Sequence, residues 1–243
     1  MLIVNADDWG RSVAETDAAL RCHDNGRLTS VSAMVFMKDS ERAAELAKEN
    51  NISVGLHLNF TEGFTRSCIS RSLLECHGRV ASFLRRGKYS QLLYNPFLRK
   101  EFSYSYRVQA AEFERLFGEP VSRVDGHHHM HLCANLLLSE AIPSGMKVRR
   151  NFSFWPGEKS RLNRTYRALV DRWLHRKYRL PDYFFDLTQT IREEKMDRVV
   201  ELASSSEVEL MTHPIIRTES EYLLRDRFRA VLNRLNTASC ALA

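Results

Sequence analysis

The stretch Leu2-Ile3-Val4-Asn5-Ala6-Asp7-Asp8 opens the chain with an apolar run that ends in two adjacent carboxylates. The apolar part has the length of a short buried strand. A strand gains no stability from two acidic side chains at its end, so Asp7 and Asp8 are candidates for a functional site. Taken alone, the pair is equally typical of a turn or a helix cap before Gly10.

Apolar runs of strand length alternate with stretches of helical period along the rest of the chain. We expect strands at 30–37, 52–60, 146–152, 184–187 and 208–215, and an apolar run at 121–125 that leads into a histidine cluster. We expect helices at about 12–26, 40–50, 103–117, 135–141, 161–178, 191–204 and 219–236. This rhythm, with its short connections, predicts a parallel α/β sheet. Residues 61–100 interrupt it, as a substrate loop or lid would.

The composition is that of an ordinary globular protein, with 243 residues, 44% of them hydrophobic and 27% charged. No low-complexity stretch or linker divides the chain, so we expect one domain. Five widely spaced cysteines without a CxxC pair argue against a disulfide framework and a thiolate zinc site. With no signal-like or membrane-spanning segment in the sequence, we expect a cytoplasmic protein.

The net charge of +6 is concentrated in a few basic stretches, above all the one between Lys159 and Arg179. A solvated face explains such stretches, and so does attraction to an anionic substrate, a nucleic acid or a membrane surface. No nucleic-acid motif accompanies them, so we expect no nucleic-acid partner.

Imidazoles gather at expected strand ends, where parallel α/β proteins build their sites. His57 lies in an apolar strand, and four more histidines stand within Asp125-Gly126-His127-His128-His129-Met130-His131. In an extended chain His127, His129 and His131 would share one face, with His128 on the other. The spacing does not tell which of them binds. Together with Asp7 and Asp8, they predict a hydrolase with one divalent cation.

Three further side chains end predicted strands. His213 precedes a proline and suits a general acid, since an unperturbed imidazole has a pKa near 6.5. Arg149 and Arg150 could clamp a substrate oxygen or orient an aspartate, or they could form a surface pair. We take Arg149, Arg150 and His129 as candidates for substrate binding.

Five motifs, in this order along the chain, resemble the YdjC-like carbohydrate deacetylases, a family that includes the bacterial chitooligosaccharide deacetylase. They are Asn5-Ala6-Asp7-Asp8-Trp9-Gly10, Thr29-Ser30, Val54-Gly55-Leu56-His57-Leu58, the histidine cluster after Asp125, and Thr212-His213-Pro214. The resemblance implies a single domain over residues 1–243 with the distorted (β/α) TIM-like barrel of the family.

The resemblance also implies the chemistry, which is removal of an acetyl group from an N-acetylated sugar with a divalent metal such as Mg²⁺, Zn²⁺, Mn²⁺ or Co²⁺. By position, the metal ligands would be Asp8, His57 and His127, with Asp7 as general base and His213 as general acid. The family's motif usually has a small serine- or threonine-like residue where this chain has Gly126.

The family commonly ends in a further strand, whereas this chain ends in Thr-Ala-Ser-Cys-Ala-Leu-Ala, so the barrel would close incompletely or differently. Two other functions stay open at this point: a different barrel metallohydrolase such as a phosphoesterase, and a non-catalytic metal- or sugar-binding protein. A homodimer also stays open.

Overall fold

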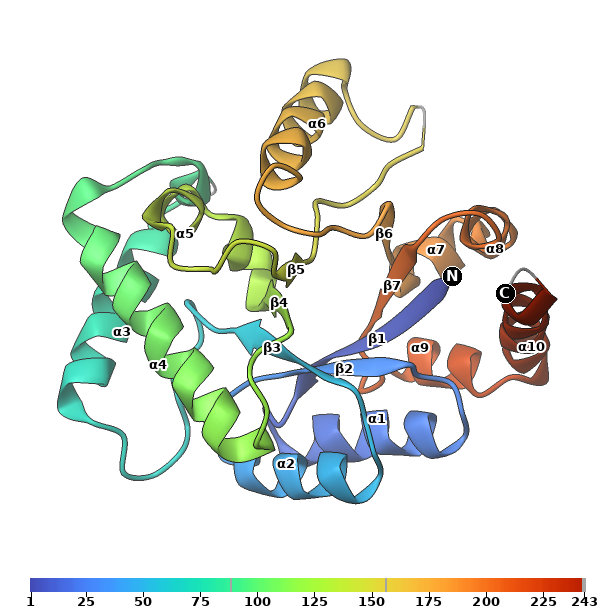
Figure 1. The fold of residues 1–243 in the computed structure, drawn as a ribbon, viewed down its shortest axis with the longest axis horizontal. Helices are drawn as coiled ribbons and strands as arrows, with labels where there is room; N and C mark the ends of the chain where they lie inside the picture. Colours follow the sequence, from blue (N-terminus) through green and yellow to red (C-terminus); the bar gives the residue numbers. More distant parts are fainter. Residues whose placement is uncertain (88, 156, 242–243) are drawn as a thin grey trace. The chain divides into compact units, whose positions relative to one another are not determined.

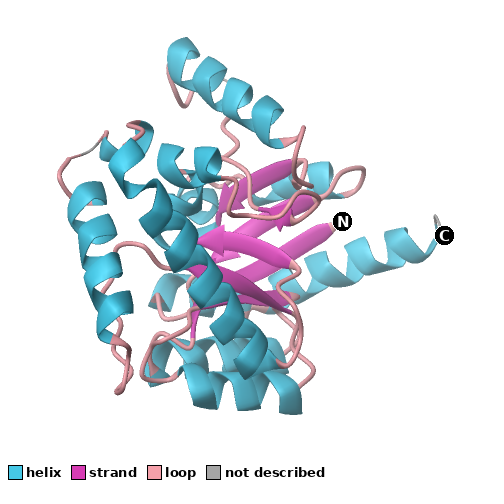
Figure 2. Cartoon of the chain, turned by 60° about the vertical axis from the view of Figure 1, so that its left-hand side comes forward, coloured by secondary structure: helices cyan, strands magenta, loops and turns pink. Residues whose placement is uncertain are grey.

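In the computed structural model of the protein, residues 1–87, 89–155 and 157–241 are described, with side chains as far as Leu235. Strands and helices alternate along most of the chain, as the colours of Figure 1 and the magenta and cyan of Figure 2 show. The strands are β1 (Leu2–Trp9), β2 (Ser30–Ala33), β3 (Val54–Leu58), β4 (Arg123–Gly126), β5 (Lys147–Val148), β6 (Tyr183–Asp186) and β7 (Val208–Thr212).

Ten α-helices and three short 3-10 segments connect the strands in the described part of the chain. The helices are α1 (Val13–Asp24), α2 (Ser40–Glu49), α3 (Arg71–Leu84), α4 (Arg99–Phe117), α5 (Ala134–Ser139), α6 (Arg161–Leu174), α7 (Leu187–Arg192), α8 (Met196–Ala203), α9 (Arg217–Leu223) and α10 (Asp226–Ala241). The 3-10 segments are η1 (Ser90–Leu92), η2 (Pro96–Leu98) and η3 (His127–Leu132).

The strand order is β5-β4-β3-β2-β1-β7-β6, and the pairs β1–β7, β3–β4 and β6–β7 are parallel. The first strand therefore has β2 on one side and the last strand, β7, on the other, as in a (β/α) barrel. The predicted parallel, barrel-like α/β fold is confirmed. Strands β1 and β7 are neighbours inside this order, and β5 and β6 form its two ends, so the barrel is incompletely closed among the described strands.

The chain divides into two compact units, which we describe separately. Unit 1 comprises Met1–Asp7, Asp17–Val31 and Lys147–Ala243, and unit 2 comprises Asp8–Thr16 and Ser32–Met146. Both β1 and β2 contribute residues to both units. A single domain over residues 1–243 therefore stays a prediction.

In unit 1, β7 pairs with β1 and β6 along nearly its whole length. The register places Ala6 opposite Thr212, so the next residues, Asp7 and His213, leave the paired strands at the same end. Neighbouring strands lie about 4.8 Å apart, so the two backbones are close at this point. Alternating apolar residues such as Phe184 and Leu210 are fully buried.

In unit 2, β3 pairs with β4 so that His57 lies opposite Asp125. Helix α4 packs against α2 and α3, and the Phe102 ring of α4 meets the Phe60 ring with centroids 5.3 Å apart. Both rings are fully buried. The β3 and β4 backbones thereby have a rigid support at the strand ends that carry the polar residues.

Four sequence-based expectations need correction. Residues 61–100 are not a plain loop, because they contain α3. The strand expected at 146–152 shrinks to the two residues of β5. The helices expected at 191–204 and 219–236 are each two helices, with breaks near Glu194 and Leu224.

Within the part of the chain that the structure describes, no helix combines the length and hydropathy that a membrane crossing requires.

Candidate metal and catalytic site

Asp8 ends the regular part of β1 in a left-handed conformation, with φ of +64°. Aspartate tolerates this region better than most residues, and backbone strain of this kind gathers at functional sites. The side chain is buried, and its Oδ1 lies 2.9 Å from His127 Nδ1 and 3.3 Å from His57 Nε2. One carboxylate oxygen thus faces two imidazole nitrogens.

His57 is held in place from behind. Its Nδ1 lies 2.7 Å from Asp125 Oδ1, and Ser32 Oγ donates to the other oxygen of Asp125 at 2.5 Å. A carboxylate only accepts hydrogen bonds, so the hydrogen of a neutral His57 belongs on Nδ1. Its Nε2, which faces Asp8, then carries the lone pair that a metal ligand needs.

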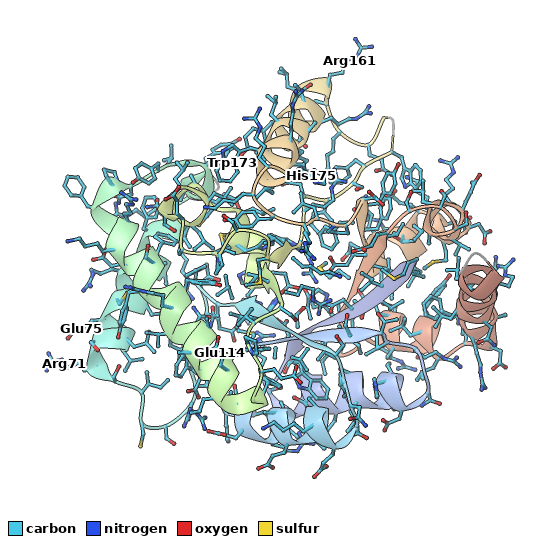
Figure 3. The ribbon with its side chains drawn as sticks, viewed as in Figure 1. Arg71, Glu75, Glu114, Arg161, Trp173 and His175 are labelled. Atoms are coloured by element: carbon cyan, nitrogen blue, oxygen red, sulfur yellow. The ribbon has the colours of Figure 1, made fainter. Side chains whose placement is uncertain are left out.

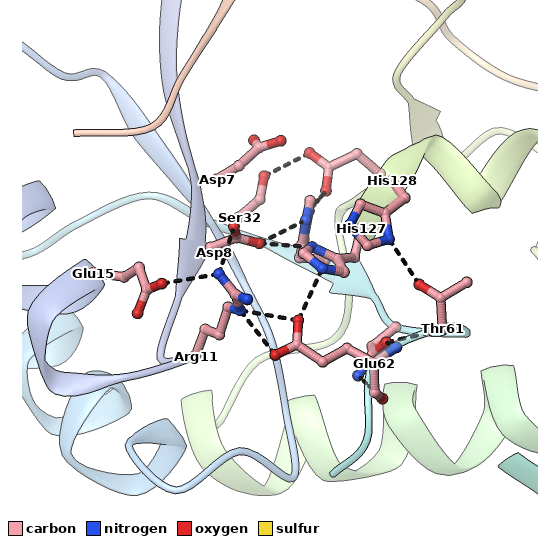
Figure 4. A network of polar contacts seen from close by, with 12 residues as sticks. Asp7, Asp8, Arg11, Glu15, Ser32, Thr61, Glu62, His127 and His128 are labelled. Atoms are coloured by element: carbon pink, nitrogen blue, oxygen red, sulfur yellow. Dashed lines mark hydrogen bonds and ion pairs between the residues drawn. The ribbon is translucent and has the colours of Figure 1, made fainter. Parts of the chain in front are cut away.

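His127 follows β4 and also lies beside a carboxylate, at ion-pair distance. Its Nε2 lies 2.9 Å from Glu62 Oε2, and its Nδ1 faces Asp8. Arg11 binds Glu62 in turn, with Nε 2.9 Å from Oε2. Figure 4 shows these contacts converging on Asp8 and His127. Each imidazole therefore has one nitrogen toward Asp8 and the other against a carboxylate.

The donor set of Asp8, His57 and His127 fits a divalent cation. One ligand atom from each residue lies within 4.8 Å of the others, and all three side chains are buried. Burial alone would raise the pKa of Asp8, but the adjacent imidazoles of His127 and His57 outweigh it and hold that pKa far below its usual value. The ionised carboxylate and neutral imidazoles are the forms that bind Zn²⁺ and related ions.

The histidine cluster is not extended, so the expectation that its members alternate between two faces is wrong. His127–Leu132 forms a 3-10 turn, with His128 and His129 at φ of +53° and +58°. His128 Nδ1 lies 3.0 Å from Thr61 Oγ1, and burial lowers the pKa of His128. Of the cluster, only His127 joins Asp8 and His57 in the described ligand group.

A tight turn explains Gly126. A Cβ at this position would come within 3.0 Å of the His131 backbone nitrogen. Only glycine allows the chain to fold back so closely here. His131 is fully buried beside it.

Asp7 belongs to a buried network in unit 1. Arg149 Nη1 and Nη2 donate to its two oxygens, each at 2.7 Å, and Arg149 Nε donates to Glu209 at 2.8 Å. Asn5 Nδ2 also donates to Asp7 at 2.8 Å, and Ser30 Oγ donates to Asn5. Asn5 and Ser30 come from two of the quoted motifs, and through these contacts both help to position Asp7.

The two arginines differ in their surroundings. The Arg149 side chain is fully buried and lies over the Phe184 ring at 4.9 Å. Its placement fits the orienting of an aspartate better than contact with a substrate. Arg150 forms an ion pair with Asp171 at 2.7 Å, and it is partly exposed. Substrate binding by either arginine, or by His129, stays a prediction.

His213 follows β7 and sits beside two carboxylates. Ligand atoms of Asp186, His213 and Glu219 lie within 4.8 Å of one another, and the His213 backbone N–H donates to Glu219. Burial raises the pKa of Glu219, against hydrogen bonds from Thr188 and from the His213 backbone that act to lower it.

Sequence reasoning missed the carboxylates that support the candidate site residues. Asp125 had a signal, since it is an acid directly before the cluster. Glu62 had none, because it lies in the stretch read as a long connection, and only the folded chain brings it to His127. Glu209 had a weak one, as a charged residue inside an apolar strand.

Comparisons with known proteins show which family the chain belongs to. Residues 1–234 match the model of the family described as YdjC-like protein. A carbohydrate deacetylase from Brevibacillus brevis is 31% identical over 224 residues, which cover 90% of this chain and 83% of that protein. A chitooligosaccharide deacetylase from Proteus mirabilis is 35% identical over 133 residues. That match spans 54% of this chain and half the length of the Proteus protein.

A solved structure shares the fold. The crystal structure of a proposed cellobiose-phosphate cleavage protein from Enterococcus faecalis V583 superposes with a TM-score of 0.62 at 20% identity. It covers 96% of this chain and 94% of that one. On the strength of the family match and the Brevibacillus relative, the chain belongs to the YdjC-like family.

Proposed function

We propose that the protein is a metal-dependent deacetylase that hydrolyses the acetamide of an N-acetylated sugar. The observation that carries this proposal is the pair of supported imidazoles, His57 and His127, whose inner nitrogens both face Asp8. Three buried ligands with carboxylates behind them are typical of catalytic metal sites with open positions. The relatives named as carbohydrate deacetylases supply the substrate class.

Asp8, His57 and His127 would hold the cation, and their mixed oxygen and nitrogen donors suit Zn²⁺, Mg²⁺, Mn²⁺ or Co²⁺. When bound, a divalent cation polarises a carbonyl group and makes water more acidic. Asp125 and Glu62 would keep the two imidazoles in the ligating orientation.

Asp7 would take a proton from the attacking water. Each of its oxygens accepts a hydrogen bond from Arg149, and Oδ1 also accepts one from Asn5. The guanidinium and Asn5 fix the direction of the carboxylate, which is what a general base requires.

His213 would protonate the leaving amine of the sugar. It follows Thr212, which pairs with Ala6, the residue before Asp7, and the carboxylates of Asp186 and Glu219 lie near enough to orient the ring. The same three residues could instead hold a second cation. A metal titration separates the two roles. Binding of about one cation per chain, lost in His57→Ala, supports His213 as the general acid, whereas binding of two cations per chain contradicts that role.

N-acetylglucosamine oligomers are the first substrates to test, because relatives matched over half their length are named chitooligosaccharide deacetylases. The long connection between β3 and α4 has a sequence of its own, so the sugar preferred by this chain can differ. A cytoplasmic location and a homodimer stay predictions.

The test is acetate release from a panel of acetylated sugars by protein stripped of metal and then reloaded with each cation. Asp7→Asn should lower kcat by about 10²–10⁴-fold, as expected for loss of a general base. Asp8→Asn should abolish both cation binding and acetate release, whereas Asp24→Asn, on an exposed helix end, should change neither. Loaded protein that releases no acetate from any sugar would overturn the proposal.

A further inference from the structure

Helix α6 exposes the residues that a helix normally buries. Leu162, Tyr166 and Leu169 are 85%, 46% and 62% exposed, and their i, i+4, i+7 spacing puts them on one face. The buried residues of the helix are instead Asp171 and Leu174. In Figure 3, Arg161 marks one end of this helix and Trp173 lies near the other. An apolar stripe with this exposure indicates a surface for a partner.

The charge around the stripe has one sign. Between Lys159 and Arg179 the sequence has eight basic residues and a single acid, Asp171. That acid is buried and forms an ion pair with Arg150, so it does not neutralise the helix surface. Arg161, Arg164 and Arg172 are all exposed. The partner therefore has to offer negative charge beside an apolar phase.

Unit 2 carries a second surface of the same composition, around η1 and η2. From Arg85 to Lys100 the sequence has five basic residues and no Asp or Glu. Exposed apolar and aromatic side chains stand between the basic ends: Tyr89 at 65%, Leu92 at 43%, Leu93 at 60%, Tyr94 at 42% and Phe97 at 89%. Two unrelated segments, one in each unit, thus combine basic flanks with an exposed apolar centre.

We propose that these two surfaces, the α6 stripe and the segment 89–97, bind the protein to the surface of an anionic membrane. Leucine, tyrosine and phenylalanine enter the boundary between headgroups and acyl chains, and the arginines remain with the anionic headgroups. A second copy of this chain would bring basic surfaces together, and a nucleic acid would leave the leucines in water. The proposal goes beyond deacetylation, and its residues are separate from the proposed site.

The test is sedimentation of the full chain with vesicles of phosphatidylcholine alone or mixed with phosphatidylglycerol, at low and high salt. We expect binding to the mixed vesicles that salt weakens. The double variant Leu162→Gln/Leu169→Gln should lower the affinity for the mixed vesicles by at least about tenfold, because neither position then buries an apolar side chain in the membrane. Arg164→Gln should weaken binding about fivefold. Phe97→Ser tests the segment 89–97 in the same way.

Matched controls are Leu138→Gln, a half-exposed leucine of α5, and Arg229→Gln, an exposed arginine of α10. Both should bind as the original chain does. Absence of binding to the mixed vesicles would overturn the proposal, as would binding that Leu162→Gln/Leu169→Gln and Phe97→Ser leave unchanged. A dimer in solution that Leu162→Gln/Leu169→Gln dissolves would also overturn it, in favour of self-association. None of these outcomes depends on acetate release.

Discussion

At the residue scale, the ligand histidines depend on the carboxylates behind them. Asp125 accepts from His57 Nδ1, and it is itself held by Ser32. Removing such a supporting group typically lowers metal affinity by about 10–100-fold, because the imidazole loses its orientation and part of its basicity. We expect this loss for Asp125→Ala in a zinc competition titration, and a smaller loss for Asp125→Asn, which keeps an acceptor. Unchanged affinity in Asp125→Ala would contradict the supporting role.

The depressed pKa of Asp8 gives a second prediction, for the metal-free protein. The folded-state pKa lies below the ordinary value of 3.8, so the ionised carboxylate contributes stability above that pH and loses it as the pH falls. With a chelator present, the free energy of unfolding should fall more steeply below about pH 5 in the original chain than in Asp8→Asn. Asparagine is chosen because it tolerates the left-handed backbone. Parallel pH profiles of the two proteins would refute the explanation.

The candidate residues could be found from sequence only where the chemistry was locally improbable. Two adjacent acids at a strand end, and four imidazoles in five residues, are unusual enough to be noticed alone. The spacing did not tell which imidazole of the cluster faces Asp8, since this depends on the 3-10 turn after Gly126, and only the resemblance to the family implied His127. Glu62 could not be identified from the sequence either, because its contact with His127 depends on long-range packing.

At the element scale, apolar runs located the strands, whereas the helix α3 was missed. The buried residues of α3 include Leu73, Cys76, His77, Val80 and Leu84, which is helical spacing. The polar His77 interrupts the apolar pattern in the sequence. In the structure its Nε2 lies 2.7 Å from the Glu62 carbonyl oxygen, which makes its burial acceptable. The helix was therefore missed because a tertiary contact satisfies a residue that reads as polar.

Two glycines give a matched prediction about helix stability. Gly118 ends α4 with φ of +76°, whereas Gly78 lies inside α3, and a Cβ would meet nothing within 4 Å at either position. Gly118→Ala should reduce the free energy of unfolding by about 1 kcal/mol through backbone strain. Gly78→Ala should raise it by about 0.5–1 kcal/mol, since alanine favours the helix. Urea unfolding measures both, and shifts of the same sign would contradict the backbone explanation.

At the scale of the whole molecule, the boundary between the units passes between Asp7 and Asp8. Asp7, Arg149 and Glu209 belong to unit 1, whereas all three candidate ligands, with Asp125 and Glu62, belong to unit 2. One strand, β1, thus supplies the proposed base to one unit and a ligand to the other. A sequence read as a single domain does not reveal this division, because β1 and β2 run through it without a linker.

A cation that binds the three ligands should stabilise unit 2 in the first place. At a free concentration one hundred times its dissociation constant, the gain is about 2.7 kcal/mol. We expect zinc to slow amide hydrogen exchange in β3, β4 and η3 more than in β6 and α8, which contain none of Asp8, His57 and His127. Asp8→Asn, measured by the same mass spectrometry, should show no zinc effect. Equal slowing of amide exchange in β3 and β6 would contradict this prediction. It would mean that the two units open together, so that the stabilisation by the metal is not confined to unit 2.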